Sequence, residues 1–149
     1  MKVPFADDAS IDRVGAMKPT MQHSDTSSSP KKANTLIESF GYAWQGIARA
    51  SRERNFRIHC VVAVAAFTLC AVLRVEPWGW VVVAIAVGLV LSSECINTAL
   101  ESVVDLASPE IHPLAKTAKD CAAGSVLILA MMAVVVGCVV FGTAIFNLF

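Results

Sequence analysis

Three carboxylates and an amide recur at helical spacing directly after a long apolar run. They are Glu94, Asn97, Glu101 and Asp105, and the apolar run is Trp78–Leu91. At 100° per residue, Glu101 lies about 20° from Glu94 around a helix and Asp105 about 20° to the other side, so the carboxylates share one stripe. A rise of about 1.5 Å per residue places Glu94 roughly 10 Å deeper than Glu101. Ionisable groups at membrane depth are costly, so this acidic stripe is a candidate functional site.

Basic residues accompany the acidic stripe at the predicted cytoplasmic ends of the helices. Carboxylate oxygens suit Mg²⁺, which takes one or two carboxylates together with substrate phosphates. Lys119 and nearby arginines would neutralise a polyphosphate. Glu94 lies deeper, where only a lipid headgroup reaches, and a carboxylate held away from water suits a general base. The pattern therefore predicts a water-soluble phosphate donor that meets a membrane-bound hydroxyl.

A competing interpretation is that these acids merely end helices and pair with basic residues at the membrane interface. This interpretation is weakest for Glu94, which has no basic residue within a turn or two along the chain. For Asp105 both interpretations stay open. His59, at the start of the first predicted span, is expected to be an interfacial histidine and not a ligand.

The composition is typical of a membrane protein. Hydrophobic residues make up 56% of the chain and charged residues 16%, and the apolar residues come in long blocks. The formal net charge is zero, which gives no argument for a nucleic-acid partner. All of the 12 Lys and Arg except Arg74 either precede Ile58 or are Lys116 and Lys119. The positive-inside rule then places the N-terminus and the candidate site in the cytoplasm.

An amphipathic surface helix is predicted over residues 35–54. Thr35 and Glu38 fit a capping box, and apolar residues follow at helical spacing with charged residues on the opposite face. Residues 1–33 are rich in Asp, Ser, Lys and Pro without sustained periodicity. We therefore expect a disordered cytoplasmic tail over 1–33, ahead of a membrane domain over 34–149.

Three membrane spans are predicted over about residues 57–75, 78–104 and 119–147. The segment Leu106–Lys116 contains two prolines and is expected to be a cytoplasmic loop. The fold class is therefore an all-α membrane protein with a surface helix and three transmembrane helices. Because three helices cannot fully shield Glu94 from lipid, we expect a neighbouring subunit to cover it.

A longer pattern extends the stripe, and it resembles a known family. The pattern reads Glu94-x-x-Asn97-Thr98-Ala99-Leu100-Glu101-x-x-x-Asp105, then His112-Pro113-Leu114-Ala115-Lys116-x-Ala118-Lys119-Asp120, and is preceded by Glu53-Arg54-Asn55-Phe56-Arg57-Ile58-His59. It is similar to the prokaryotic diacylglycerol kinase family, small integral-membrane lipid kinases that include the undecaprenol kinases. The similarity covers roughly residues 36–145.

The resemblance implies a homotrimer in the bacterial inner membrane that transfers the γ-phosphate of MgATP to a lipid alcohol. It implies that Glu94 is the general base with Asn97 as its support, and that Glu53 and Glu101 bind Mg²⁺. The residues implied to contact the nucleotide are Tyr42, Glu53, Glu101, Glu110, Ile111, His112, Lys119 and Asp120. The residues expected to contact the lipid substrate are Glu94, Phe56 and Arg57.

Several alternatives stay open. The Arg54–His59 stretch and the His112–Lys116 segment look more like the undecaprenol-type members than the diacylglycerol-type ones. Physical chemistry does not separate the two lipids, because both present a hydroxyl and long apolar tails. A small ion- or proton-coupled transporter that uses Glu94 is a different class, although the chain has no inverted repeat. A structural trimer without catalysis is a third class, which leaves the clustered acids and Lys119 unexplained.

Overall fold

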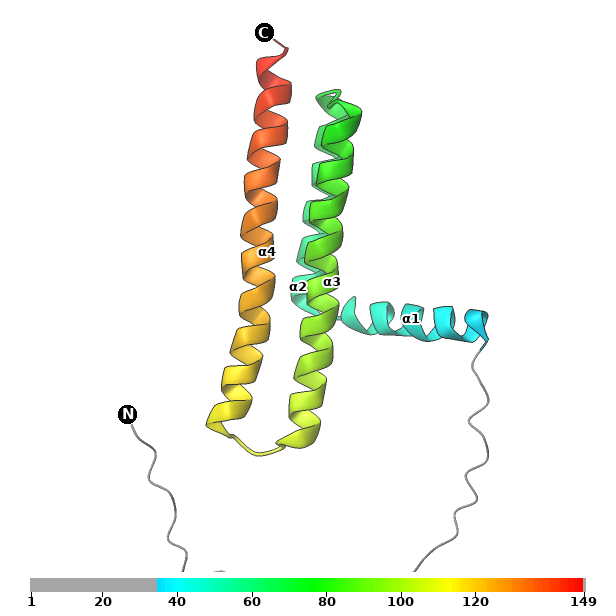
Figure 1. Ribbon diagram of the computed structural model, residues 1–149, viewed down its shortest axis with the longest axis vertical. Helices are drawn as coiled ribbons and strands as arrows, with labels where there is room; N and C mark the ends of the chain where they lie inside the picture. Colours follow the sequence, from blue (N-terminus) through cyan, green and yellow to red (C-terminus); the bar gives the residue numbers. More distant parts are fainter. Residues whose placement is uncertain (1–34, 149) are drawn as a thin grey trace, which may run out of the picture. The chain divides into compact units, whose positions relative to one another are not determined.

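A computed structural model describes residues 35–148, and the regular structure within this range is entirely α-helical (Figure 1). The helices are α1 (Leu36–Ala50), α2 (Arg54–Val72), α3 (Pro77–Ala107) and α4 (Pro113–Phe146). The all-α prediction is confirmed. The tail predicted over residues 1–33 lies outside the described range.

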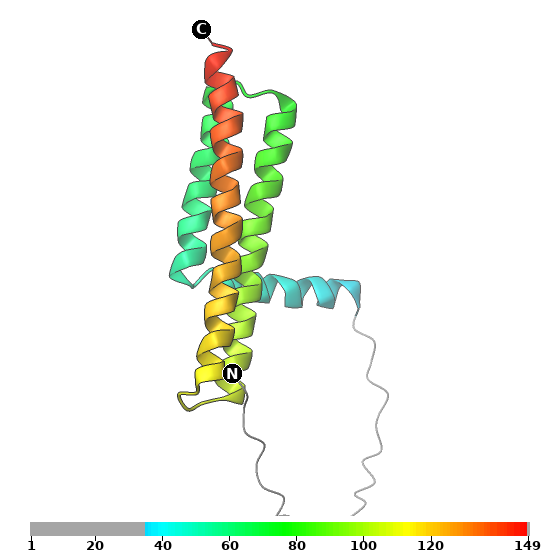
Figure 2. The same cartoon turned by 60° about the vertical axis from the view of Figure 1, so that its left-hand side comes forward.

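Helix α1 begins as predicted and ends earlier than predicted. The Thr35 hydroxyl accepts from the Glu38 amide at 3.3 Å and the Glu38 carboxylate accepts from the Thr35 amide at 2.8 Å, which completes the capping box. The helix stops at Ala50 and not at residue 54. The reason is a tight turn, in which the Arg52 and Glu53 amides donate to carbonyls three residues back. This turn redirects the chain into α2, and α1 lies crosswise to the other helices (Figures 1 and 2).

Helices α2, α3 and α4 are each long and apolar enough to cross a membrane, as the sequence predicts. With 31 and 34 residues, α3 and α4 extend about 46 and 51 Å. The hydrocarbon core of a bilayer is about 30 Å thick, so both helices are longer than a span requires. Figures 1 and 2 show that α3 and α4 run together past the start of α2.

The loop between α3 and α4 is shorter than predicted. The prediction placed the loop over Leu106–Lys116 and the start of the third span at 119, whereas α4 already begins at Pro113. Proline fits the first position of a helix, because its missing N–H would have no helical acceptor there. His112 caps this end, since its Nδ1 accepts from the Leu114 amide at 3.2 Å. The prolines therefore mark the start of a helix and not an extended loop.

The interior of the helix bundle is built on α3, which packs along α2, along α4 and against α1. The bundle interior contains few buried apolar side chains. On α2 these side chains recur every seven residues, at Phe56, Ala63 and Cys70. Val83 and Val90 repeat that spacing on α3. A seven-residue repeat keeps one narrow seam of each helix facing its neighbour. Further along this seam, the buried residues of α3 change from apolar to polar.

Candidate functional site

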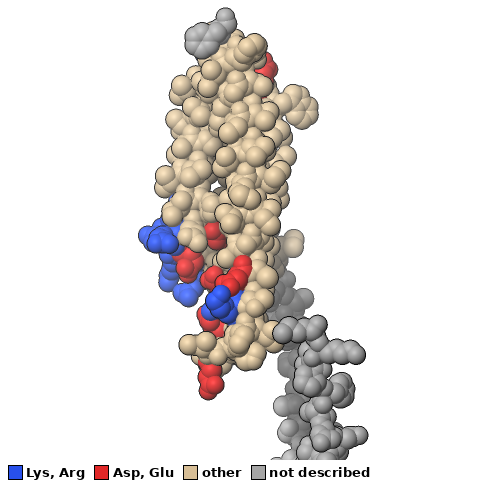
Figure 3. Space-filling model, turned by 90° about the vertical axis from the view of Figure 1, so that its left-hand side faces the viewer, with Lys and Arg blue, Asp and Glu red and all other residues tan. Residues whose placement is uncertain are grey.

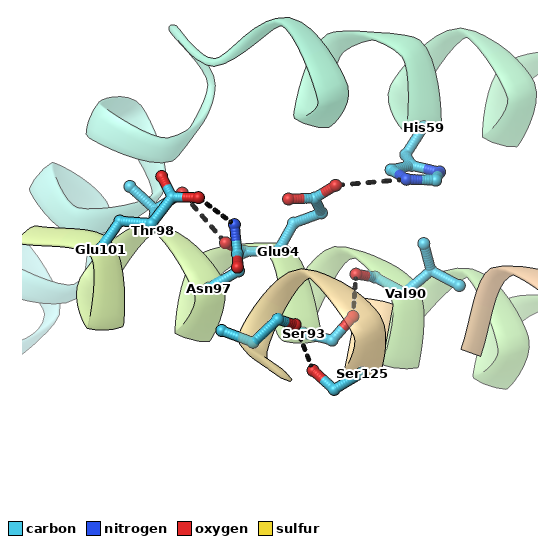
Figure 4. Close-up of polar contacts among 9 residues, drawn as sticks. His59, Val90, Ser93, Glu94, Asn97, Thr98, Glu101 and Ser125 are labelled. Atoms are coloured by element: carbon cyan, nitrogen blue, oxygen red, sulfur yellow. Dashed lines mark hydrogen bonds and ion pairs between the residues drawn. The ribbon is translucent and has the colours of Figure 1, made fainter. Parts of the chain in front are cut away.

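Four polar residues are buried in the described part of the chain, and all four lie on adjoining turns of α3. They are Ser93, Glu94, Asn97 and Thr98. Two of them satisfy their hydroxyls on the helix itself: Ser93 donates to the Val90 carbonyl at 2.8 Å, and Thr98 donates to the Glu94 carbonyl at 3.0 Å (Figure 4). The side chains of Glu94 and Asn97 instead contact other side chains.

Glu94 finds its partner on α2. Figure 4 shows His59 projecting from α2 toward Glu94, with the imidazole Nε2 and the carboxylate Oε1 3.2 Å apart. The Glu94 side chain is only 3% exposed and that of His59 is 23% exposed. The chain alone therefore buries this carboxylate, so our expectation that a neighbouring subunit is needed to shield Glu94 is wrong. The reason is that α2 lies across the acidic stripe and supplies a basic group from a distant part of the sequence.

His59 is the residue that sequence reasoning missed. We expected an interfacial histidine, and it lies instead three residues after Phe56 and four before Ala63, on the buried side of α2. Residues three and four apart share a helix face, so this spacing indicates that His59 lies on the same side of the helix as Phe56 and Ala63. What the spacing does not reveal is which residue of α3 lies opposite.

Asn97 carries an unsatisfied buried acceptor. Its Nδ2 donates to Glu101 Oε1 at 3.0 Å, which fixes the orientation of the amide (Figure 4). Its Oδ1 is buried and has no hydrogen-bond partner in the described part of the chain. Leaving such a group unpaired costs about 1–3 kcal/mol. A hydroxyl or a water molecule at this site would supply the missing donor.

The two predicted metal ligands come from α3 and from the turn that precedes α2. Glu101 is on α3, two turns from Glu94, and Glu53 is the residue that precedes α2 and makes no side-chain bond to the helix end. Both are close enough for their charges to act on Glu94. No group of three or more His, Cys, Asp and Glu residues placed to hold a metal ion occurs within 35–148. A pair of carboxylates nevertheless fits Mg²⁺, which completes its coordination with waters and substrate phosphates.

Two exposed ion pairs lie beyond the buried residues. Lys119 on α4 donates to Asp105 on α3, and Lys116 donates to Asp120 at 2.6 Å along α4. Figure 3 shows acidic and basic side chains gathered at one end of the bundle. Asp105, four residues after Glu101 on α3, thus pairs with a basic residue of α4. Asp120, predicted beside it, is turned toward Lys116.

The remaining predicted contact residues lie on α1, at the start of α2 and in the loop before α4. Tyr42 is exposed on α1, and the loop before α4 exposes Glu110 and Ile111. His112 uses Nδ1 as the cap of α4. Of the two further residues expected to contact the lipid, Arg57 is exposed whereas Phe56 is packed inside the chain. Their roles toward a nucleotide or a lipid stay predictions.

An apolar groove of about 520 Å³ runs between α2, α3 and α4. Its lining is formed by small and branched apolar side chains, among them Ala63, Val87 and Ala133. His59 is the basic residue in this lining. His59, which contacts Glu94, therefore also lines an apolar groove.

Comparison with known proteins identifies similar sequences. Residues 41–141 match the family model described as prokaryotic diacylglycerol kinase. A diacylglycerol kinase of Synechocystis sp. is 50% identical over 107 residues, which cover 70% of this chain and 61% of that relative. An undecaprenol kinase of Bacillus subtilis is 35% identical over 78% of this chain and 96% of its own length. A diacylglycerol kinase of Escherichia coli is 34% identical over 70% of this chain and 86% of its own length.

Proposed function

The chain belongs to the prokaryotic diacylglycerol kinase family, as its sequence pattern predicts, and on this basis we propose that it transfers the γ-phosphate of MgATP to a membrane lipid alcohol. The observation that carries the proposal is the buried carboxylate of Glu94 on a helix long and apolar enough to span a membrane. Glu101 lies two turns away, toward the end of the bundle where charged side chains gather (Figure 3).

In the proposed reaction the lipid hydroxyl oxygen attacks the γ-phosphorus of ATP. A new bond forms between this oxygen and the phosphorus, the bond from the phosphorus to the β,γ-bridging oxygen breaks, and ADP leaves. The hydroxyl proton passes to Glu94. Since phosphoryl transfer has a loose transition state, positioning and charge neutralisation contribute most of the rate. Glu94 therefore orients the hydroxyl as well as accepting its proton.

The other predicted residues have distinct parts in this proposal. Glu53 and Glu101 would hold Mg²⁺, which would neutralise charge on the phosphates. Asn97 keeps Glu101 in place through Nδ2, and its unpaired Oδ1 is an acceptor for a substrate hydroxyl or a bound water. Lys119 leaves Asp105 for the phosphates when the nucleotide binds.

The proposal extends to the membrane and the assembly. The Lys and Arg distribution favours a cytoplasmic N-terminus and active site in the bacterial inner membrane. A homotrimer follows from the family resemblance alone, because the burial of Glu94 within one chain removes our separate argument for it. Chemical crosslinking in native membranes tests the trimer, and a crosslinked ladder that stops at the monomer would contradict it.

We propose undecaprenol as the acceptor, because the Arg54–His59 stretch and the His112–Lys116 segment resemble those of undecaprenol-type members. Diacylglycerol is the second candidate, because the Synechocystis relative, at 50% identity, is named a diacylglycerol kinase. The test is transfer of radiolabelled γ-phosphate from ATP to each lipid in detergent, with the protein purified. Label in the extracted undecaprenol at a higher rate than in diacylglycerol is the expected result. Label in neither lipid would contradict the proposed activity and reopen the transporter and structural alternatives.

A further inference from the structure

His59 connects the proposed base with the groove that borders it. Its Nε2 lies 3.2 Å from Glu94 Oε1, and its ring forms part of the groove lining. The residue comes from α2, whereas Glu94 belongs to α3, so the contact fixes the two helices relative to each other as well as the two side chains (Figure 4).

Glu94 depends on this one contact. Among the described residues, the one basic group within 4 Å of its carboxylate is the His59 imidazole. Two acidic side chains, Glu101 and Glu53, also act on it, and they carry the same sign. A carboxylate that is 3% exposed has lost nearly all of its water, and a buried charge needs a partner and hydrogen bonds to be tolerated. His59 Nε2, at 3.2 Å, is the partner that the described residues supply.

The contact also leaves one side of the carboxylate available. His59 engages Oε1, and the second oxygen, Oε2, takes no part in this contact. Because Oε1 is held, rotation of the carboxylate is restricted and Oε2 keeps a fixed direction. The hydroxyl of a lipid that enters between α2 and α3 would meet this second oxygen.

We propose that His59 is a positioning residue for phosphoryl transfer: it holds Glu94 through Oε1 so that Oε2 accepts the proton of the lipid hydroxyl. The inference rests on the proposed kinase function. It assigns His59 a role that acts through Glu94 and requires a hydrogen-bond donor at this position, not merely a side chain that fills space.

The test compares two substitutions of His59 with a control on the same helix. His59→Leu fills the space without a donor, and His59→Gln keeps an N–H donor at the reach of Nε2. Val61→Ala, an exposed position two residues away, is the control. Initial rates of labelled-phosphate transfer give kcat, the KM for the lipid and the KM for ATP, and thermal unfolding in detergent reports on folding.

We expect His59→Leu to lower kcat by about 10- to 100-fold, the range of one hydrogen bond to a charged group. His59→Gln should restore most of the rate, and the KM for ATP should stay unchanged. Wild-type kcat in His59→Leu would overturn the inference. Equal losses in both variants, together with equal losses of thermal stability, would show a merely structural role and would also overturn it.

A double-mutant cycle with Glu94→Asp tests whether His59 acts through the base. The shorter side chain withdraws the carboxylate from the imidazole, so His59→Leu should cost much less on this background than on the wild type. Equal costs on both backgrounds would mean that His59 acts independently of Glu94. If the wild type labels no lipid at all, the kinase proposal fails, which is a different outcome from any of these.

Discussion

The molecule contains two acid–base pairs that differ in burial. Glu94 and His59 pair inside the bundle with side chains 3% and 23% exposed, whereas Lys116 and Asp120 pair along α4 with side chains 77% and 62% exposed. Exposed pairs contribute little to stability, because water and salt screen them. A buried pair is costly to assemble and costly to break. Function should therefore depend steeply on the buried pair and weakly on the exposed one.

Glu101→Gln should cause the largest loss among the following variants. Glutamine keeps an oxygen that can accept from Asn97 Nδ2, so the local packing survives while a carboxylate is lost. Transfer should fall by about 100-fold, since a metal stabilises the transferred charge by several kcal/mol. Raising the Mg²⁺ concentration should recover part of the rate. Full activity at low Mg²⁺ would remove Glu101 from the proposed metal site.

Asn97→Leu should separate stability from activity. The substitution deletes a buried acceptor that has no partner, so the thermal unfolding temperature in detergent should rise, by the equivalent of about 1 kcal/mol. Transfer should fall by about 10- to 100-fold, because Glu101 loses the donor that holds it. A fall in both stability and activity would indicate that Asn97 serves the fold and not the site.

Lys119→Met should have a smaller and more selective effect. Lys119 is partly exposed and pairs with Asp105, so the loss of this pair should change stability by less than about 1 kcal/mol. The KM for ATP should rise by about tenfold while the KM for the lipid stays the same. Steady-state rates over a range of ATP concentrations provide the measurement. An unchanged KM for ATP would contradict the proposed contact with the phosphates.

Lys116→Met should have the smallest effect and serves as the matched control for Lys119. Both lysines belong to α4 and pair with an aspartate, but Lys116 pairs within its own helix and is highly exposed. Rates and KM values should stay within about twofold of the wild type. A larger loss of activity in Lys116→Met than in Lys119→Met would contradict the proposal that Lys119, and not Lys116, contacts the phosphates.

Periodicity predicts which residues share a face, and it predicted the acidic stripe correctly. Glu94, Asn97 and Glu101 lie along one side of α3, and the hydrogen bond between the last two joins residues four apart. The capping box at Thr35 is equally local and was also correct. Such features follow from helix geometry alone, so a single sequence contains them.

The contact between Glu94 and His59 was beyond the same reasoning. It joins residues of different helices, and helical spacing identifies the buried side of α2 without identifying its neighbour on α3. The shielding of Glu94 was misjudged for this reason. The predicted start of α4 was wrong for a different reason. Proline breaks a helix when it lies in the interior, but it is favoured in the first turn, and Pro113 occupies that position.

The most direct test of the account is Glu94→Gln, assayed for labelled-phosphate transfer and for nucleotide binding in one preparation. Glutamine has nearly the same shape but accepts no proton, and the nucleotide is proposed to bind nearer the helix ends. We predict that transfer falls by orders of magnitude while MgATP binding and thermal stability are retained. Transfer at the wild-type rate in Glu94→Gln would contradict the central claim that this buried carboxylate activates the lipid hydroxyl.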